Sequence, residues 1–419
     1  MSLSRLGEGY PRLAPGPRGL AGLRRREPGR RGWLRGRAFG SQSPLRHYDW
    51  ILVGTVLALC VLGTLLVWSA TEPSLLQAGA SPRTYLYKEV AWFSIGLVLM
   101  VVVSSLDVRQ IRAYTPVVYG LALLALLAVL SPLGTSINGA KAWINLPAGF
   151  QVEPSEFAKL ALVLICALVL SRLGDGGKRP LLREIALTVA LAVPLAGLVA
   201  AEPALGVTLV LLAVLAGMIA ISGLRLRWLT VLAAGGTLAM VAAIKLHVLK
   251  SYQLQRFTSF LHPSANLAGA GYQAEQARIA VGSGGMFGHG LFHGPLVAGN
   301  YIPSQPTDFI FTVVGEELGF VGSIAIVALL GVVIARALRI AARAEDQFGM
   351  LVASGIAIWF GFQAFVNVGM TIGIMPITGL PLPFISYGGS AALADMIAIG
   401  VLLSIHRRRT GIEAIWTRR

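Results

Sequence analysis

The sequence predicts an all-α, polytopic membrane protein with about ten transmembrane helices, and three observations support this fold class. The composition is the first: 55% of the 419 residues are hydrophobic and only 13% are charged, with a mean hydropathy of +0.71. A water-soluble core of ordinary composition cannot hide that much apolar surface. The second observation is a series of long apolar runs, and the third is the distribution of basic residues between them.

Ten apolar runs are long enough to cross about 30 Å of hydrocarbon. They lie near residues 50–70, 89–105, 115–131, 154–172, 183–201, 204–222, 229–247, 309–335, 349–369 and 388–405. Each run is expected to form one helix. Only Glu202, Pro203 and Ala204 separate the fifth run from the sixth, so either a tight hairpin or a re-entrant element is expected at that point.

Basic residues indicate which side of the membrane each loop occupies. If the Arg-rich N-terminal segment is cytoplasmic, four connecting loops lie on the same side. These loops carry Arg109, Arg112, Lys178, Arg179, Arg225, Arg227, Arg336, Arg339 and Arg343. Both termini are then cytoplasmic, and the large loop at 248–308, between the seventh and eighth helices, is extracytoplasmic.

The net charge of +16 does not indicate nucleic acid binding, because no basic stripe with interleaved aromatic residues occurs. Residues 1–47 contain too few apolar residues to fold, and we expect a disordered, basic cytoplasmic tail that binds anionic membrane lipids. The following apolar run has no small-residue cleavage site, which argues against a signal peptide. A transmembrane domain is predicted at 48–406, followed by a second basic cytoplasmic tail at 407–419.

Asp308 is the first candidate for chemistry. It lies in the segment YIPSQPTDFIF, where a loop enters the eighth apolar run. A carboxylate at that depth is costly and is rarely kept without a role. Four more polar segments fall on the same predicted side, at 137–160, 251–263, 271–291 and 379–391. A site built there would act outside the cytoplasm, without ATP.

Glu156 and Lys159 are the second candidate. Pro154 suits the first turn of the fourth helix, and Glu156 and Lys159 then lie at i and i+3 on one helical face. One interpretation is a buried ion pair that locks two helices together. The other is a pair that lines a polar cavity and orients Asp308 or a phosphate group. The sequence leaves both open.

The glycine-rich segment at 282–290 allows a backbone to approach a ligand closely. No strand precedes it and no Lys-Ser or Lys-Thr pair follows, so a flexible rim over a lipid-headgroup cleft is favoured over a nucleotide loop. His289 and His293 stand four residues apart, but no local acid or cysteine completes a zinc site. Cys60 and Cys166 lie in apolar runs and are predicted to be small core residues.

Three further charged residues have two interpretations each. Arg256, outside the seventh helix, has a planar fork of donors that suits a pyrophosphate-linked substrate, but it equally suits lipid headgroups. Glu316 and Glu317 fall about two turns below Asp308, and at least one is expected to face the bundle interior. They would either relay a proton or serve packing and helix hydrogen bonding.

Five patterns along the chain resemble one family closely. They are NGAKAWI…EPSEFAKL, YQLQRFTSFL, GYQAEQARIAVGSGG, PTDFIFTVVGEELGF and MTIGIMPITGLPLPFISYGGSA. The family is that of shape, elongation, division and sporulation (SEDS) proteins, and the resemblance runs from about Tyr48 to His406. Four details are more similar to the elongation branch than to the division branch: the Asp49-Trp50 pair, YQLQRFTSFLHP, NVGMTIGIMPITGLPLPF and the terminal SIHRRR.

This resemblance implies a peptidoglycan glycosyltransferase that polymerises lipid II into glycan strands at the outer face of the bacterial cytoplasmic membrane. Asp308 matches the family's essential extracytoplasmic aspartate and would act as general base. Glu156 and Lys159 match its polar pair, and Arg256 and Lys159 would stabilise charge on the departing undecaprenyl diphosphate. The candidate substrate-binding residues are Glu156, Lys159, Arg256, Lys141, Gln273 and Ser283.

The resemblance also implies binding partners. Family members pair with a class B penicillin-binding protein, the transpeptidase that crosslinks new strands. Apolar surfaces on the eighth and ninth helices are candidate docking sites, although the sequence does not single out the helices. The remaining expected partners are lipid II, the growing glycan strand and membrane lipids, with no nucleic acid. No residue cluster demands a cofactor or a metal, although a lipid diphosphate could bring a divalent cation with it.

The chain departs from the family pattern at two positions. The family usually has an acid where Ala204 stands, and commonly has His where Pro306 stands. The first departure puts in doubt a role for the hairpin in metal or substrate binding, and the second affects the backbone before Asp308. Two rival functions stay open: a flippase, which should need polar groups along the whole membrane depth, and a scaffold without chemistry of its own.

Overall fold

The computed structural model describes residues 48–137, 140–146, 150–171, 182–202, 204–223 and 269–409, with isolated residues between 230 and 260. The helices are α2 (Trp50–Gln77), α3 (Thr84–Ser105), α4 (Val108–Leu130), α5 (Pro154–Leu170), α6 (Leu182–Ala201), α7 (Leu205–Ile221), α10 (Ala270–Ser283), α11 (Pro295–Ala298), α12 (Ile310–Val313), α13 (Gly319–Ala342), α14 (Gln347–Thr371) and α15 (Gly389–Arg409). A π-helix, η5 (Val314–Leu318), joins α12 to α13. Three strands are β1 (Gly134–Ile137), β2 (Ala140–Leu146) and β3 (Phe150–Val152).

The predicted fold class is confirmed. Seven helices in the described ranges are long and apolar enough to cross a membrane, counting α12, η5 and α13 as one. They correspond to the first, second, third, fifth, eighth, ninth and tenth apolar runs, and the shorter α5 and α7 coincide with the fourth and sixth. The seventh run, the N-terminal tail and the end of the C-terminal tail lie outside the described residues, apart from isolated positions in the seventh.

Several helices extend beyond the apolar runs that predict them. α4 starts at Val108 because the Asp107 side chain accepts the N–H of Arg109 while the Gln110 side chain accepts the N–H of Asp107, which forms a capping box. α13 continues to Ala342, and α15 continues through the basic residues up to Arg409. Hydropathy falls at charged residues, whereas the helical backbone continues until its terminal groups are capped.

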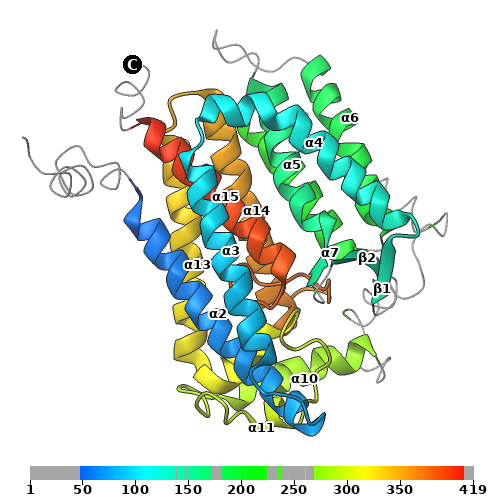
Figure 1. The fold of residues 1–419 in the computed structure, drawn as a ribbon, viewed down its shortest axis with the longest axis vertical. Helices are drawn as coiled ribbons and strands as arrows, with labels where there is room; N and C mark the ends of the chain where they lie inside the picture. Colours follow the sequence, from blue (N-terminus) through cyan, green and yellow to red (C-terminus); the bar gives the residue numbers. More distant parts are fainter. Residues whose placement is uncertain are drawn as a thin grey trace, which may run out of the picture. The chain divides into compact units, whose positions relative to one another are not determined.

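α5, α14 and α15 form the buried centre of the bundle. Nearly every residue of α5 is buried, and about three quarters of the apolar stretches of α14 and α15 are buried too. α15 passes between α3 and α14 (Figure 1). Small residues allow this close packing: a Cβ at Gly400 would lie 2.8 Å from the carbonyl oxygen of Met100, and one at Gly389 would overlap the Trp92 ring.

A small antiparallel sheet, which the sequence analysis did not predict, leads into the central helix α5. Its strand order is β1-β2-β3, with Thr135 opposite Trp143 and Ile144 opposite Val152. β2 contacts α4, and β3 contacts α15. The sheet therefore guides the chain from the end of α4 to the start of α5, where Glu153 precedes the helix.

α6 and α7 form a tight helical hairpin. α6 ends at Ala201 and α7 starts at Leu205, and the two helices pack against each other. Of the two interpretations left open by the sequence, the hairpin is the one that the structure contains.

The two ends of the bundle differ in chemistry. One end carries the sheet, the α6–α7 hairpin, α10 and α11 (Figure 1). Asp308 lies just before α12, which contacts α10, so we call this end the Asp308 end. The opposite end carries an ion pair between Arg336 and Asp49, with Nε 2.8 Å from Oδ2, and a second pair between Arg408 and Asp346 at 3.1 Å. This opposite end coincides with the basic loops of the sequence.

Candidate functional site

Asp308 lies in a tight turn that precedes α12. Its backbone N–H donates to the carbonyl of Ser304 at 3.1 Å, and its own carbonyl accepts from the side-chain amide of Asn367 at 2.8 Å. The N–H of Tyr387 also donates to the carbonyl of Pro306 at 2.9 Å. The Asp308 residue is half-buried. The backbone around the carboxyl group is thus fixed from three directions.

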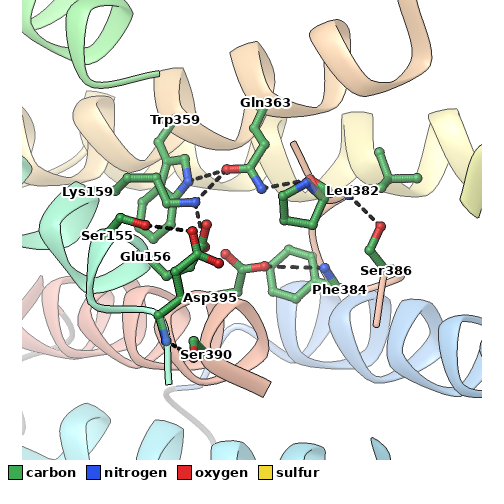
Figure 2. A network of polar contacts seen from close by, with 12 residues as sticks. Ser155, Glu156, Lys159, Trp359, Gln363, Leu382, Phe384, Ser386, Ser390 and Asp395 are labelled. Carbon is green, nitrogen blue, oxygen red and sulfur yellow. Dashed lines mark hydrogen bonds and ion pairs between the residues drawn. The ribbon is translucent and has the colours of Figure 1, made fainter. Parts of the chain in front are cut away.

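Glu156 and Lys159 lie one turn apart on α5, inside the bundle. Lys159 Nζ donates to Glu156 Oε2 at 2.6 Å and to Gln363 Oε1 of α14 at 2.9 Å (Figure 2). The ammonium also lies 4.9 Å from the centroid of the Trp359 ring, within range of a cation–π interaction. Both charged residues are buried, with 0% of Lys159 and 2% of Glu156 exposed. The pair therefore joins α5 to α14.

A buried loop between α14 and α15 extends this network. Gln363 Nε2 donates to the carbonyl of Pro381 at 2.8 Å, and the N–H of Phe384 donates to Asp395 Oδ2 at 3.3 Å (Figure 2). Phe384 has a φ of +63°, which is an outlier for a bulky residue. Such a conformation persists only where the surroundings hold it, and it is typical of functional sites.

Glu153, at the start of α5, connects this network to Asp308. Its backbone N–H donates to Ser390 Oγ at 2.7 Å. Burial and the nearby Glu156 carboxylate raise the pKa of the Glu153 side chain, and the charge of Asp308 raises it further. Burial, followed by the charge of Glu153, raises the pKa of Glu202 to about 8. Charges affect each other only over short distances. These mutual effects therefore indicate that the carboxyl groups of Glu153, Glu156, Glu202 and Asp308 lie close together at the Asp308 end.

Four members of this site were not predicted from the sequence: Glu153, Gln363, Asn367 and Asp395. A signal was present for three of them. Asp395 lies inside the tenth apolar run, so the argument that singled out Asp308 applies to it too. Gln363 and Asn367 stand four residues apart in the ninth run, which puts two amides on one helical face. Glu153 has no signal besides its place before Pro154.

The other predicted binding residues lie elsewhere. Lys141 is on β2, and its Nζ donates to a carbonyl at the end of α4 at 3.1 Å. Gln273 is half-buried on α10, and Ser283, at the end of α10, donates to a carbonyl of its own helix at 2.8 Å. In the described part of the chain, none of these contacts connects them to Asp308. Arg256 lies outside the described residues, and the binding roles of all four stay predictions.

The glycine-rich segment and the Glu316–Glu317 pair pack on each other. Gly288 has a φ of +77°, and a Cβ there would lie 2.1 Å from the carbonyl oxygen of Glu317. Glu316 Oε1 accepts the N–H of Leu296 at 2.6 Å, and Glu317 Oε1 accepts the hydroxyl of Ser69 at 2.5 Å. Both glutamates are buried, which confirms that at least one faces the interior. These contacts support the packing interpretation, and they explain the glycines without a ligand.

The described residues do not assemble a metal site. In those ranges, no group of three or more His, Cys, Asp or Glu side chains is arranged to hold a metal ion. The Nδ1 atoms of His289 and His293 lie 3.2 Å and 2.7 Å from backbone carbonyl oxygens. Cys60 and Cys166 are free and buried, as predicted. A divalent cation that arrives with the lipid diphosphate stays a prediction.

An apolar groove of about 570 Å³ lies where α10, α13 and α14 meet. It is lined by Val281, Gly282, Gly285, Phe311, Phe320, Ser323, Ile324, Val327, Ala328, Val368 and Ile372. These residues belong mostly to the predicted eighth and ninth helices. The groove therefore lies on two helices that the sequence analysis named as candidates for docking.

Comparison with known proteins identifies the family. A family model described as a cell cycle protein, which groups FtsW, RodA and SpoVE, matches residues 49–411. A probable peptidoglycan glycosyltransferase FtsW of Trichlorobacter lovleyi is 36% identical over 362 residues, covering 86% of this chain and 93% of that protein. The chain belongs to the SEDS family. The SEDS protein is a glycosyltransferase, because its relatives of both branch names are peptidoglycan glycosyltransferases.

Further relatives support this assignment of the SEDS chain. The peptidoglycan glycosyltransferase MrdB of Escherichia coli K12 is 35% identical over 370 residues, covering 87% of this chain and 94% of that protein. A chain of a peptidoglycan synthase complex that coordinates polymerization and crosslinking aligns with a TM-score of 0.71 at 32% identity, over 86% of this chain and 98% of that one. The rod shape determining protein RodA of Thermus thermophilus aligns with a TM-score of 0.62 at 31% identity, over 86% and 97%.

An acid, Glu202, lies at the α6–α7 hairpin of the SEDS chain. It stands two residues before Ala204, the position at which the family usually has an acid. Glu202 is fully buried, and both of its carboxylate oxygens lack a hydrogen-bond partner among the described residues. At the second departure, Pro306 is accommodated because its carbonyl accepts the N–H of Tyr387. The turn that carries Asp308 is therefore tied to the loop before α15.

Proposed function

We propose that this protein polymerises lipid II into glycan strands at the outer face of the bacterial cytoplasmic membrane during cell elongation. The observation that carries the proposal is the setting of Asp308. The Asp308 residue is half-buried, its backbone is held by hydrogen bonds, and its charge acts on Glu153, which the charges of Glu156 and Lys159 also affect. A catalytic base must be held in place in this way while keeping access to a reacting proton.

The reaction is a single displacement at the anomeric carbon of the donor sugar. Ionised Asp308 accepts the proton of the acceptor hydroxyl as that oxygen attacks the anomeric carbon. The bond from the anomeric carbon to the diphosphate oxygen breaks at the same centre, and its electron pair leaves with the undecaprenyl diphosphate. One displacement inverts the configuration, so an α-linked donor yields a β-linked strand.

Lys159 supports this reaction from inside the bundle. Its ammonium is fully buried and bonded to Glu156 and Gln363, so it contributes a fixed positive charge behind the site. A fixed charge in a low-dielectric setting stabilises developing negative charge without reorganisation. Arg256, with its planar fork of donors, is proposed to contact the departing diphosphate directly.

The orientation in the membrane follows from charge. The end with the Arg336–Asp49 and Arg408–Asp346 pairs coincides with the basic loops, so we assign it to the cytoplasm. The Asp308 end then faces outward, where lipid-linked substrates present their sugars. The elongation role rests on the sequence details shared with that branch, since relatives from both branches have similar identity to this chain.

A class B penicillin-binding protein is the proposed partner. The solved complex that coordinates polymerization and crosslinking resembles this chain in fold. The groove between α13 and α14 is apolar and about 570 Å³ in volume, which suits the single membrane helix of such a transpeptidase. Docking there would bring the crosslinking enzyme close to Asp308, since Phe311 lines the groove one turn along the chain.

The decisive experiment measures polymerisation of lipid II by the wild type and by Asp308→Asn, each with a cognate partner in detergent. We expect Asp308→Asn to lower the rate on the order of 10²- to 10⁴-fold, because general-base catalysis contributes that much. Asp107→Asn is the matched control. This half-buried N-cap at the start of α4 tolerates Asn as well as Asp. Undiminished synthesis by Asp308→Asn would refute the proposal.

The same assay separates the rival functions. A flippase has no work to do in detergent, so glycan strands formed there would count against it. A scaffold without chemistry would keep its cellular function in Asp308→Ala, whereas a polymerase would lose it. The distribution of charge favours the polymerase, because Glu153, Glu156, Glu202 and Asp308 gather at one end of the bundle.

A further inference from the structure

Asn367 occupies an unusual position for an amide. It lies inside the apolar helix α14 and is fully buried. Its Nδ2 donates to the carbonyl of Asp308 at 2.8 Å and to the carbonyl of Leu380 at 2.6 Å. A side-chain amide has two N–H groups, and both are used here. Asn367 therefore connects the backbone of the catalytic turn to the loop before α15.

The two acceptors determine how this amide is oriented. If the amide were flipped, its oxygen would face two carbonyl oxygens, which repel it. In the observed orientation Oδ1 is buried and has no hydrogen-bond partner among the described residues. Leaving a buried acceptor unsatisfied has a cost. The two hydrogen bonds that Nδ2 donates therefore outweigh the cost of leaving Oδ1 without a partner in the described residues.

Gln363, one turn earlier on α14, repeats this arrangement. Its Nε2 donates to the carbonyl of Pro381 at 2.8 Å, and its Oε1 accepts from Lys159 at 2.9 Å. Two amides on one face of α14 thus bind adjacent carbonyls, those of Leu380 and Pro381. Gln363 therefore holds Lys159, and Asn367, one turn later on the same helix, holds the backbone of Asp308.

We propose that Asn367 is a positioning residue that sets the location of the Asp308 carboxyl group. It acts by holding the Asp308 carbonyl while the Ser304 carbonyl holds the Asp308 N–H. With both sides of the residue fixed, the side chain leaves the backbone in one direction. This inference rests on the proposed function, in which Asp308 is the general base. Displacement of a catalytic group by about 1 Å can cost about 100-fold in rate.

The kinetic test uses Asn367→Asp, which keeps the shape but replaces the donor by an acceptor. With lipid II and a cognate partner, we expect kcat to fall about 10- to 100-fold while KM stays within about threefold. Asn367→Ser, which retains one donor, should fall between Asn367→Asp and the wild type. Thr371→Val is the matched control, because among the described residues this buried hydroxyl one turn later bonds within its own helix, to the carbonyl of Val368. An unchanged kcat in both Asn367 variants, or equal losses in Thr371→Val, would overturn the proposal.

A second measurement does not depend on turnover. Asp308→Cys places a thiol at the catalytic position, and the native Cys60 and Cys166 are buried, so they give a low background. We expect the rate of its reaction with a charged methanethiosulfonate reagent to change when Asn367→Ala is added, because thiol reactivity follows exposure and environment. The same rate with and without Asn367→Ala would overturn the inference even if Asp308 proves catalytic. A changed rate would support it even if Asp308→Asn remained active and the proposed function failed.

Discussion

At the scale of single residues, Lys159 and Glu156 allow the two interpretations of their ion pair to be separated. The charges lie 2.6 Å apart and are buried. Lys159→Met removes one charge and leaves Glu156 buried without its partner, which should destabilise the protein by about 3–5 kcal/mol. We expect a lower melting temperature in detergent together with loss of polymerisation.

The double variant Lys159→Met, Glu156→Gln tells these two losses apart. Replacing both members of a buried pair is often neutral for stability, so the melting temperature should recover. We expect polymerisation to stay absent, because the fixed positive charge behind the site is gone. Recovery of activity together with stability would show that the pair only locks α5 to α14.

Glu202 gives a prediction about pH. Its pKa is raised from 4.5 to about 8, chiefly by burial. Between pH 4.5 and about pH 8, Glu202 is therefore protonated in the folded protein but ionised in the unfolded chain. Stability therefore falls as pH rises through that window. Glu202→Gln should melt higher than the wild type at pH 8.5, and the difference should vanish near pH 4. A difference in melting temperature that is the same at all pH values would contradict the raised pKa of Glu202.

Which site residues could be predicted depends on how each one deviates from its surroundings. Asp308 and the Glu156–Lys159 pair carry charges in apolar sequence, and charge there is costly enough to imply a role. Asn367 and Gln363 are neutral amides in an apolar run, and their importance depends on the carbonyls of a loop that packs against them only after folding. Their four-residue spacing predicts a shared helical face, but no local pattern identifies the carbonyls that they bind.

At the scale of elements, Gly288 tests whether the glycine-rich segment serves packing. A Cβ at Gly288 would overlap the backbone of Glu317, and its φ of +77° disfavours other residues. Gly288→Ala should therefore detach the loop from η5, lower the melting temperature and increase cleavage of the loop by protease. Gly285→Ala is the control, because φ is +55° there but no atom lies within 4 Å. Similar losses in both variants would indicate backbone strain alone.

Helices were the easiest elements to predict and the small sheet was the hardest. A long apolar helix satisfies its own backbone, so composition alone is sufficient evidence. The three strands are short, and β1–β2 pairing includes an irregularity between Thr135 and Ser136. The π-helix η5 was also not predictable, because its carbonyls are satisfied by the loop at His289 and Gly290. Both features depend on partners that are distant in sequence.

At the scale of the whole molecule, the sequence predicts which apolar segments form helices but not which helices are neighbours. The central position of α15 against α3 depends on glycines that matter only at the crossing, such as Gly400 beside Met100. Most membrane-facing surface is apolar all round, so hydropathy does not distinguish a lipid-facing surface from a docking surface. The groove where α10, α13 and α14 meet is the additional observation that marks one apolar surface as a candidate for docking.

The groove between α13 and α14 leads to a prediction about the assembled complex. Val327 lines the groove and is 45% exposed, whereas Val98 on α3 is 62% exposed and lies outside it. A tryptophan at position 327 would fill the groove and exclude a partner helix. We therefore expect Val327→Trp to reduce co-purification with a class B penicillin-binding protein and to lower polymerisation by the mixture, while the isolated chain keeps its own rate. Val98→Trp, the matched substitution on a lipid-facing surface, should leave both unchanged. If the two variants bind the partner equally well, the transpeptidase docks elsewhere on the bundle, and the groove would then hold lipid alone.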